Sequence, residues 1–408
     1  MRGSLGRALS VGLGAVALTI AGFFSQAPAR SQDQDPSPDS LTTSALGNYL
    51  AGRFARTAQD TKDAAQFYGR ALERDPSNEV LLEQAFQMET MSGNWSNAVP
   101  LAEKLASTRE SHRMSQFLLG VTAFKSAAYP QAESHFKAAA ENPIGELTSA
   151  IALGWTRLAA GDTDGALKAV DLPKQPDWAQ FYLRYHRALM ADIAGRKAIA
   201  NATYEKMFRQ DSRTLRTALA YAQHAAHYGD FKLAKQIMRE QLSKTQGDPH
   251  PLAKEMLERI NKREKTELLI ATPSEGLAEL FYGLGEALTG EGGVSLGTIY
   301  LQLALDVKPD HAFALAALAN AQEAAKRYDD AIATYDRIPK GTPLQSAIDI
   351  RKAFNLNSLD RVDEAKAILE RLAAKDPKDV RPLEALGNIL RARKEYAEAI
   401  KYFTRALA

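Results

Sequence analysis

Residues 119–139 read LGVTAFKSAAYPQAESHFKAA, and this stretch decides the fold. Two helices that cross closely leave room only for a residue with little or no side chain at the crossing, and Gly120 and Ala132 are such residues. Phe136 follows Ala132 by four positions, so it lies on the same helical face and can fill the flanking space. The stretch therefore predicts a pair of closely packed antiparallel helices.

The same arrangement returns every 34 residues along the chain, in two series. The first column of small residues comprises Ala64, Ala98, Ala132, Ala166, Ala200 and Ala234, then Gly297, Ala331, Ala365 and Ala399. A second column lies twelve residues earlier and is small except at Phe86: Gly52, Phe86, Gly120, Gly154, Ala188 and Ala222, then Gly285, Ala319, Ala353 and Gly387. A fixed period of this length indicates a stack of repeated helix pairs.

These columns resemble the tetratricopeptide repeat family. The resemblance covers residues 45–248 as six repeats and residues 278–408 as nearly four more. It implies an all-α fold, a right-handed α-solenoid of about ten two-helix repeats in two blocks. Pro173 and Pro176 predict that the second helix of the fourth repeat ends early. Between the blocks, residues 249–277 are predicted to form a helical insert of one extra helix and a turn, with a new helix start at Thr272 near its end.

The first 44 residues differ in composition from the rest. Arg2 and Arg7 precede an uncharged apolar run from Ala8 to Phe24, and Ala27-Pro28-Ala29 fits the small-residue rule for signal peptidase. We expect residues 1–29 to be a signal peptide cleaved after Ala29, which would make the protein periplasmic or secreted. An uncleaved signal anchor is the alternative. Residues 30–44 are polar and rich in Pro and Ser, which predicts a disordered linker.

Composition excludes several classes of function. The chain has 408 residues, 51 Lys and Arg against 49 Asp and Glu, and no cysteine. The net charge of +2 equals the two leader arginines, so the remainder is neutral and gives no electrostatic reason to expect nucleic acid. Without cysteine there is no disulfide, thiolate metal site or Cys nucleophile. We expect contact with a membrane only through an uncleaved leader.

The resemblance also indicates where a partner would lie. In this family the first helix of each repeat lines a concave groove, and the residue after the second-column position should point into it. The candidate partner-binding residues in this column are Arg53, Trp155, Gln223, Asn320, Phe354 and Asn388. Amides such as Asn320 and Asn388 suit a peptide backbone because they both donate and accept hydrogen bonds. Trp155 and Phe354 are candidate apolar anchors.

A structural interpretation of the same column remains open. Trp155, Leu189 and Phe354 can equally pack between repeats, and Asn320 and Asn388 can simply face solvent. The family's mode of binding carboxylates requires several basic residues on neighbouring groove helices, and the column shows no such cluster.

No catalytic constellation emerges from the sequence. His224 and His227 lie three residues apart on one predicted helix, but no acidic residue lies near them in that helix, so we expect no metal site. Gly283, Gly285 and Gly290–Gly293 follow no strand, which argues against a phosphate-binding loop. We therefore expect no catalytic residues, cofactor or metal.

Three functional hypotheses follow. The first is a non-catalytic scaffold or adaptor, exported to the bacterial envelope, that holds peptides or helices of other proteins in its groove. The second is a substrate-recruiting arm of a larger enzyme, such as a glycosyltransferase, whose catalytic domain lies beyond residue 408. The third is a signal-anchored envelope assembly factor.

Overall fold

The computed structural model describes residues 44–110, 112–244 and 250–407. These residues form 21 α-helices and no strand, which confirms the predicted all-helical solenoid. The predicted signal peptide, and the linker apart from Ser44, lie outside the described residues. Among the described residues no helix is long and apolar enough to span a membrane.

Twelve helices form six antiparallel pairs in the first part of the chain. They are α2 (Ala45–Thr57), α3 (Thr61–Arg74), α4 (Glu79–Ser92), α5 (Trp95–Thr108), α6 (Arg113–Lys125), α7 (Tyr129–Ala138), α8 (Asn142–Ala159), α9 (Thr163–Ala169), α10 (Asp177–Ile193), α11 (Lys197–Gln210), α12 (Leu215–His227) and α13 (Phe231–Lys244). Helix α9 is short because the chain reaches Pro173 and Pro176 soon after it, as predicted.

A single helix and four further pairs follow. They are α14 (Pro251–Asn261), then α15 (Pro273–Gly290), α16 (Val294–Val307), α17 (Ala312–Ala324), α18 (Tyr328–Asp336), α19 (Gln345–Ser358), α20 (Val362–Lys375), α21 (Arg381–Ala392) and α22 (Tyr396–Leu407). The helix start predicted at Thr272 is confirmed: its side chain accepts a hydrogen bond from the backbone N–H of Glu275, and Pro273 is the first helical residue.

The columns of small residues lie where helices cross. The nine alanines of the first column are at most 2% exposed, and Gly297 is buried as well. A Cβ atom added at Gly120 would lie 2.5 Å from the ring of Phe136, and one at Gly387 would lie 2.5 Å from the ring of Phe403. Because no side chain fits at these crossings, the glycines set the distance between the two helices of a repeat.

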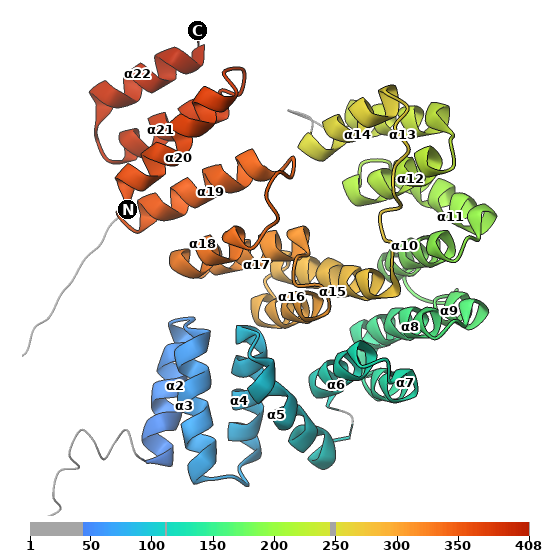
Figure 1. Ribbon diagram of the computed structural model, residues 1–408. Coiled ribbons are helices and arrows are strands. Elements are labelled where there is room, and N and C mark those ends of the chain that lie inside the picture. Colours follow the sequence, from blue (N-terminus) through green and yellow to red (C-terminus); the bar gives the residue numbers. More distant parts are fainter. Residues whose placement is uncertain (1–43, 111, 245–249, 408) are drawn as a thin grey trace, which may run out of the picture.

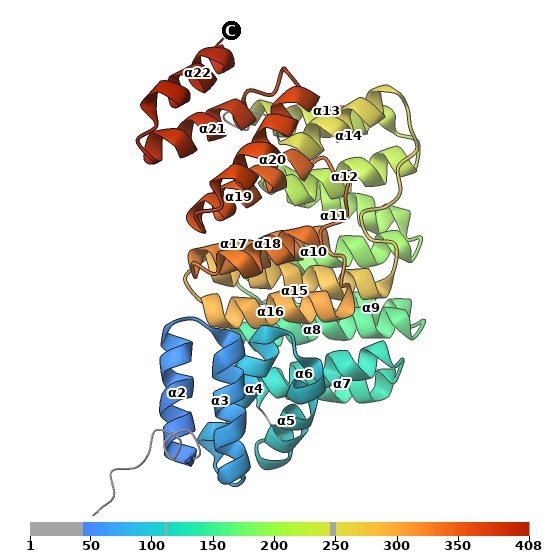
Figure 2. The ribbon, with the colours of Figure 1, turned by 60° about the vertical axis from the view of Figure 1, so that its left-hand side comes forward.

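The helix pairs do not form one simple spiral. Figure 1 shows α2 to α14 following one another around an arc, with α15 to α18 running across its inner side. Figure 2 shows α15 and α16 lying against the first-part helices, and α19 to α22 continuing beyond them. Contacts agree with the pictures, since α15 touches α8 and α10, whereas α16 touches α4 and α6.

The hydrophobic cores reflect this arrangement. One core runs from Leu82 in α4 to Ile348 in α19 and includes the helices on both sides of the insert. A second core unites α19 to α22, and a third unites α2 to α4. The buried contacts thus continue from the first part of the chain into α15 to α18. The division of the chain into two repeat blocks separated by residues 249–277 stays a prediction.

Candidate partner-binding groove

The six candidate groove residues fall in two different environments. Asn320, Phe354 and Asn388 are exposed on α17, α19 and α21, the first helices of three successive repeats. Trp155 on α8 is fully buried, and Gln223 on α12 is half-buried. Arg53 is exposed on α2 and holds its guanidinium 5.8 Å from the ring centre of Tyr49.

The chain's own hairpin of α15 and α16 explains why Trp155 is buried. Trp155 on α8 lies against α15, which runs across the inner side of the arc (Figure 1). A Cβ atom added at Gly276 of α15 would lie 2.4 Å from atoms of the Trp155 ring, so only a glycine allows this approach. In this structure Trp155 therefore contacts another part of the same chain.

A cluster of aromatic side chains packs the hairpin of α15 and α16 against α6 and α8. The ring of Phe117 on α6 lies 6.2 Å from that of Phe281 on α15 and 6.1 Å from that of Tyr300 on α16. The hydroxyl of Tyr300 lies 3.3 Å from that of Thr148 on α8. Edge-to-face and tilted ring contacts at these distances add to the free energy of apolar burial. The hairpin is thus packed into the groove, with three helices meeting at one cluster.

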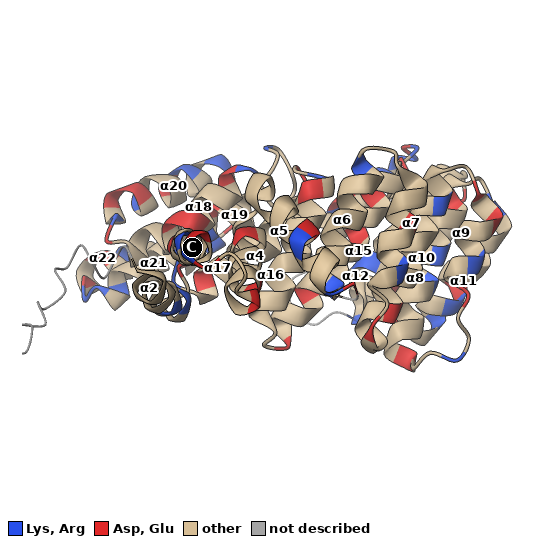
Figure 3. Cartoon of the chain, turned by 90° about the horizontal axis from the view of Figure 1, so that it is seen from below, with Lys and Arg blue, Asp and Glu red and all other residues tan. Residues whose placement is uncertain are grey.

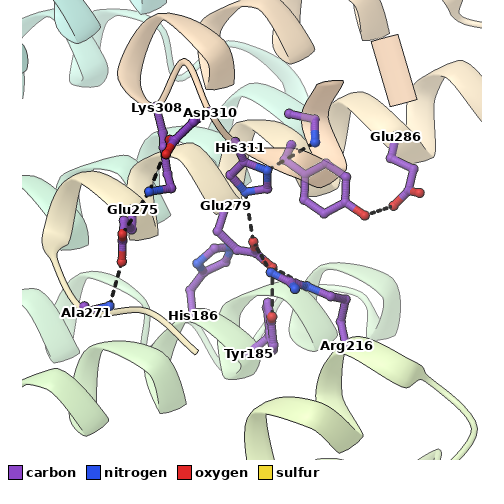
Figure 4. A network of polar contacts seen from close by, with 12 residues as sticks. Tyr185, His186, Arg216, Ala271, Glu275, Glu279, Glu286, Lys308, Asp310 and His311 are labelled. Carbon is purple, nitrogen blue, oxygen red and sulfur yellow. Dashed lines mark hydrogen bonds and ion pairs between the residues drawn. The ribbon is translucent and has the colours of Figure 1, made fainter. Parts of the chain in front are cut away.

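The buried carboxylate of Glu279 clamps the hairpin against α10 and α12 (Figure 4). Glu279 of α15 is 3% exposed and accepts hydrogen bonds from Tyr185 of α10 at 2.9 Å and from Nε of Arg216 of α12 at 3.0 Å. Its second oxygen accepts from Nη2 of Arg216 at 2.5 Å and lies 3.3 Å from Nε2 of His311. One carboxylate therefore joins α15 to α10, α12 and the start of α17.

The electrostatics of this clamp follow from burial and pairing. Burial alone raises the pKa of Glu279, but the charge of Arg216 and hydrogen bonds from His311 and Arg216 outweigh it, so its pKa lies well below the ordinary range. Burial raises the pKa of Tyr185 well above its ordinary value, and the negative charge of Glu279 raises it further. Glu279 is therefore an anion and Tyr185 a neutral donor at neutral pH.

Trp155 and His186 form a second buried polar contact beside the clamp. The indole N–H of Trp155 donates to Nδ1 of His186 at 3.1 Å. An imidazole that accepts at Nδ1 must be neutral and carry its proton on Nε2. Burial lowers the pKa of His186 to about 4, against an opposing effect of Glu279. Both observations describe a histidine that stays uncharged at neutral pH.

The exposed half of the candidate column is an open surface on the second part of the chain. Oδ1 of Asn320 accepts from the hydroxyl of Tyr335 at 2.8 Å and from Nη2 of Arg351 at 2.9 Å, and Oδ1 of Asn388 accepts from Arg391 at 3.1 Å. These contacts leave the amide N–H donors of both asparagines without a partner among the described residues. Phe354 lies one repeat from each of them and is 37% exposed. We call the exposed face of α17, α19 and α21 the open groove.

The two helical histidines have a partner that sequence reasoning missed. Nδ1 of His224 lies 2.5 Å from Oδ1 of Asp192 on α10, both residues being buried, and Nδ1 of His227 lies 2.8 Å from the carbonyl of Thr266. Asp192 is one repeat away in sequence, so only the stacking of helices reveals it. Among the described residues, no three His, Cys, Asp or Glu side chains group in a way that would hold a metal ion.

Comparison with known proteins identifies the repeats. Residues 300–346 and 358–408 match the family model described as Tetratricopeptide repeat. This part of the chain carries tetratricopeptide repeats. The matched residues include most of α16 and the whole of α17, α18, α20, α21 and α22, and the columns of small residues extend the same pattern to α2. Tetratricopeptide repeats of this kind imply a protein-interaction scaffold.

Solved structures show similar helical arrays at low sequence identity. A tetratricopeptide repeat protein from Parabacteroides merdae is 11% identical over 68% of this chain and 98% of its own, with a TM-score of 0.43. The Naa15/Naa10 structure bound to HypK-THB is 15% identical over 90% of this chain, which covers 65% of that chain, with a TM-score of 0.38. The Cut9-Hcn1 hetero-tetramer of APC/C is 13% identical over 89% of this chain and 93% of that chain, with a TM-score of 0.31. No curated protein matches the sequence.

Proposed function

We propose that the chain is a non-catalytic scaffold of the bacterial envelope that holds a segment of another protein in the open groove. One observation carries this proposal. The candidate column is covered by α15 at Trp155, whereas Asn320, Phe354 and Asn388 are exposed on three consecutive repeats. The second part of the chain is therefore where a partner meets candidate residues of this column exposed on consecutive repeats.

The chemistry of the open groove suits an extended peptide. The free amide donors of Asn320 and Asn388 can bind carbonyl groups of a peptide backbone, and Phe354 between them offers an apolar contact. The guanidinium of Arg351 pairs with Glu323 and with Asn320, so its charge is already compensated. We therefore infer a partner segment that is bound through its backbone and one apolar side chain rather than through a carboxylate.

Surface charge agrees with a partner of mixed character. In the view of Figure 3, both signs of charge are spread over the helices. The side seen in this view thus presents no extended field of one sign that would favour a strongly charged polymer. This distribution supports a protein partner and gives no reason to invoke nucleic acid.

Export to the envelope rests on the leader sequence alone. The positive start, the apolar run from Ala8 to Phe24 and the Ala27-Pro28-Ala29 site together have the form of a signal peptide. N-terminal sequencing of the protein recovered from its native cells tests this part. A start at Arg30 supports export with cleavage, a start at Met1 in a membrane fraction indicates an anchor, and recovery from the cytoplasm contradicts export.

Site-specific photo-crosslinking in the native cells tests the groove. A photoreactive phenylalanine analogue at position 354 or 388 should give discrete adducts with another protein, and the Asn320→Ala variant should reduce them at least tenfold. The same analogue at Arg371, exposed on the second helix α20 of the same repeat, is the matched control and should give none. Adducts of equal yield at positions 354 and 371, or none at 354 and 388, would contradict the proposal.

A further inference from the structure

A cavity lies where the chain closes on itself, away from the open groove. Residues of α2, α3 and α4 line one side of it, and residues of α16, α17 and α18 line the other; its volume is about 370 Å³. Pockets that bind small molecules start at about this size. None of the six candidate groove residues lines this cavity.

Specific contacts hold the two walls together. Nζ of Lys62 lies 2.9 Å from Oδ1 of Asp330, and the side-chain amide of Gln302 donates to the carbonyl of Met91 at 2.9 Å. Nη1 of Arg327 donates to the hydroxyl of Thr61 at 2.8 Å. These bonds connect residues more than 200 positions apart, so the cavity exists only because the chain folds back.

Part of the cavity wall is apolar, and polar side chains such as Thr298 and Gln302 form the rest of the lining. Met88, Leu305 and Leu318 are at most 4% exposed and line it from three different helices. Trp95 and Met91 add half-buried surface on the same side. Flexible methionine side chains adapt to apolar groups of varied shape, so this wall suits an aliphatic or aromatic body rather than one rigid ligand.

The charged residues around the cavity are mostly basic. Four cations, Arg56, Lys62, Arg327 and Arg337, line it together with a single carboxylate, that of Asp330. Lys62 and Arg327 share Asp330. Arg56 and Arg337 are exposed and make no ion pair with any described residue; Arg56 donates to Gln84 at 2.7 Å and Arg337 to the carbonyl of Pro309 at 3.5 Å. Two guanidinium groups are thus available to an anion.

One polar atom of the wall lacks a hydrogen bond. Oε1 of Gln322, on α17, is buried and has no partner among the described residues. A buried acceptor that stays unpaired costs about 1–3 kcal/mol, so a ligand hydroxyl that donates to it would be bound more tightly. This atom indicates a donor on the ligand in addition to a negative group.

We propose that this cavity binds a small amphipathic carboxylate that carries a hydroxyl group. The apolar body lies against Met88, Leu305 and Leu318, the carboxylate lies in the field of Arg56 and Arg337, and the hydroxyl donates to Gln322. This function is separate from the binding of a protein segment in the open groove. A hydroxylated medium-chain fatty acid has all three features.

Calorimetric titration of the full chain with four probes tests the chemistry of the ligand. The probes are decanoate, 3-hydroxydecanoate, decanol and decyltrimethylammonium, each below its micellar concentration. We expect decanoate to bind at least tenfold more tightly than decanol or the cation, and 3-hydroxydecanoate to bind more tightly still. Equal affinities for decanoate and decanol would overturn the proposal, because they would indicate apolar adsorption alone.

Variants locate the binding. The pair Arg56→Ala with Arg337→Ala should weaken decanoate binding at least tenfold, whereas Arg371→Ala, another exposed arginine, should leave it unchanged. Gln322→Leu should remove the advantage of 3-hydroxydecanoate over decanoate. Both arginines are at the surface, so the double variant is expected to fold. Unchanged decanoate binding in the double variant, or an undiminished hydroxyl advantage in Gln322→Leu, would refute the assignment.

Discussion

Glu279→Gln is the most direct test of the clamp that holds the hairpin. The substitution keeps the shape of the side chain but removes its charge, and it turns one acceptor into a donor that faces Nη2 of Arg216 or Nε2 of His311. Arg216 then keeps a positive charge at a site where its side chain is only 21% exposed. Breaking a buried ion pair on one side costs about 3–5 kcal/mol, and the partial exposure of Arg216 favours the lower end.

The fluorescence of Trp155 reports on this loss directly. In a chain with Trp95→Phe and Trp178→Phe, Trp155 is the single remaining tryptophan, and it is fully buried against α15. Release of the hairpin exposes it and shifts its emission to longer wavelength. A loss of about 3 kcal/mol corresponds to a change of roughly 150-fold in the equilibrium, so the urea midpoint of the Trp155 transition should fall clearly.

Glu275→Gln on the same helix is the matched control. Glu275 lies one turn before Glu279 and pairs with Lys308 at 3.0 Å, but both side chains are about 30% exposed. Partly exposed pairs contribute only about 0–1 kcal/mol. If the two variants lower the midpoint equally, or if Glu279→Gln costs less than about 1 kcal/mol, the clamp does not hold the hairpin and the reasoning fails.

Two further predictions use the same readout. Gly276→Val should lower the Trp155 midpoint by the equivalent of about 1–3 kcal/mol, because its Cβ has no room beside the indole, whereas Gly283→Ala, with its nearest neighbour at 3.6 Å, should not lower it. If Gly276→Val leaves the Trp155 midpoint unchanged, the close approach of α15 to Trp155 is not required. His186, with a pKa of about 4 when folded against an ordinary 6.5, binds fewer protons than in the unfolded chain, so stability should fall as the pH drops from about 6.5 towards 4. His186→Gln should flatten this dependence, and a wild-type midpoint that does not change between pH 7 and pH 4.5 would contradict it.

The periodic part of the fold was predictable because it depends on local packing. The residue at a helix crossing must be small whatever the neighbouring sequence is, and this requirement repeats with each helix pair. The one exception in the second column also has a physical reason. Phe86 is 1% exposed, and the position that holds a large residue in the other repeats is Ala102, which is fully buried. The large and the small residue have exchanged helices, so the total volume at the crossing is preserved.

The covered groove was not predictable from the period. The column position of Trp155 contains no information about which segment lies opposite. That contact joins residues more than 100 positions apart, and no local rule decides it. The composition of α16 does contain a signal that another segment covers this helix. Helix α16 has one charged residue in 14, Asp306, whereas a helix with one face in water needs a polar stripe. That residue pairs with Lys125 of α6 at 2.5 Å.

The arrangement of cores explains why one array can have a closed part and an open part. In a solenoid each repeat is stabilised mainly by its neighbours. A repeat that also packs against a distant repeat therefore gains a second set of stabilising contacts. Helices α15 to α18 share the core of the first part of the chain, whereas α19 to α22 form a second core, with only Ile348 of α19 reaching the first. Two of the three helices of the open groove, α19 and α21, therefore depend on fewer contacts than α15 does. Local openings with low free energy concentrate in such regions, and surfaces that adapt to a partner are drawn from them. The clamp at Glu279 and the open groove at Phe354 thus have different physical requirements: the first needs a rigid, dry environment, and the second needs accessible side chains on helices that are free to adjust.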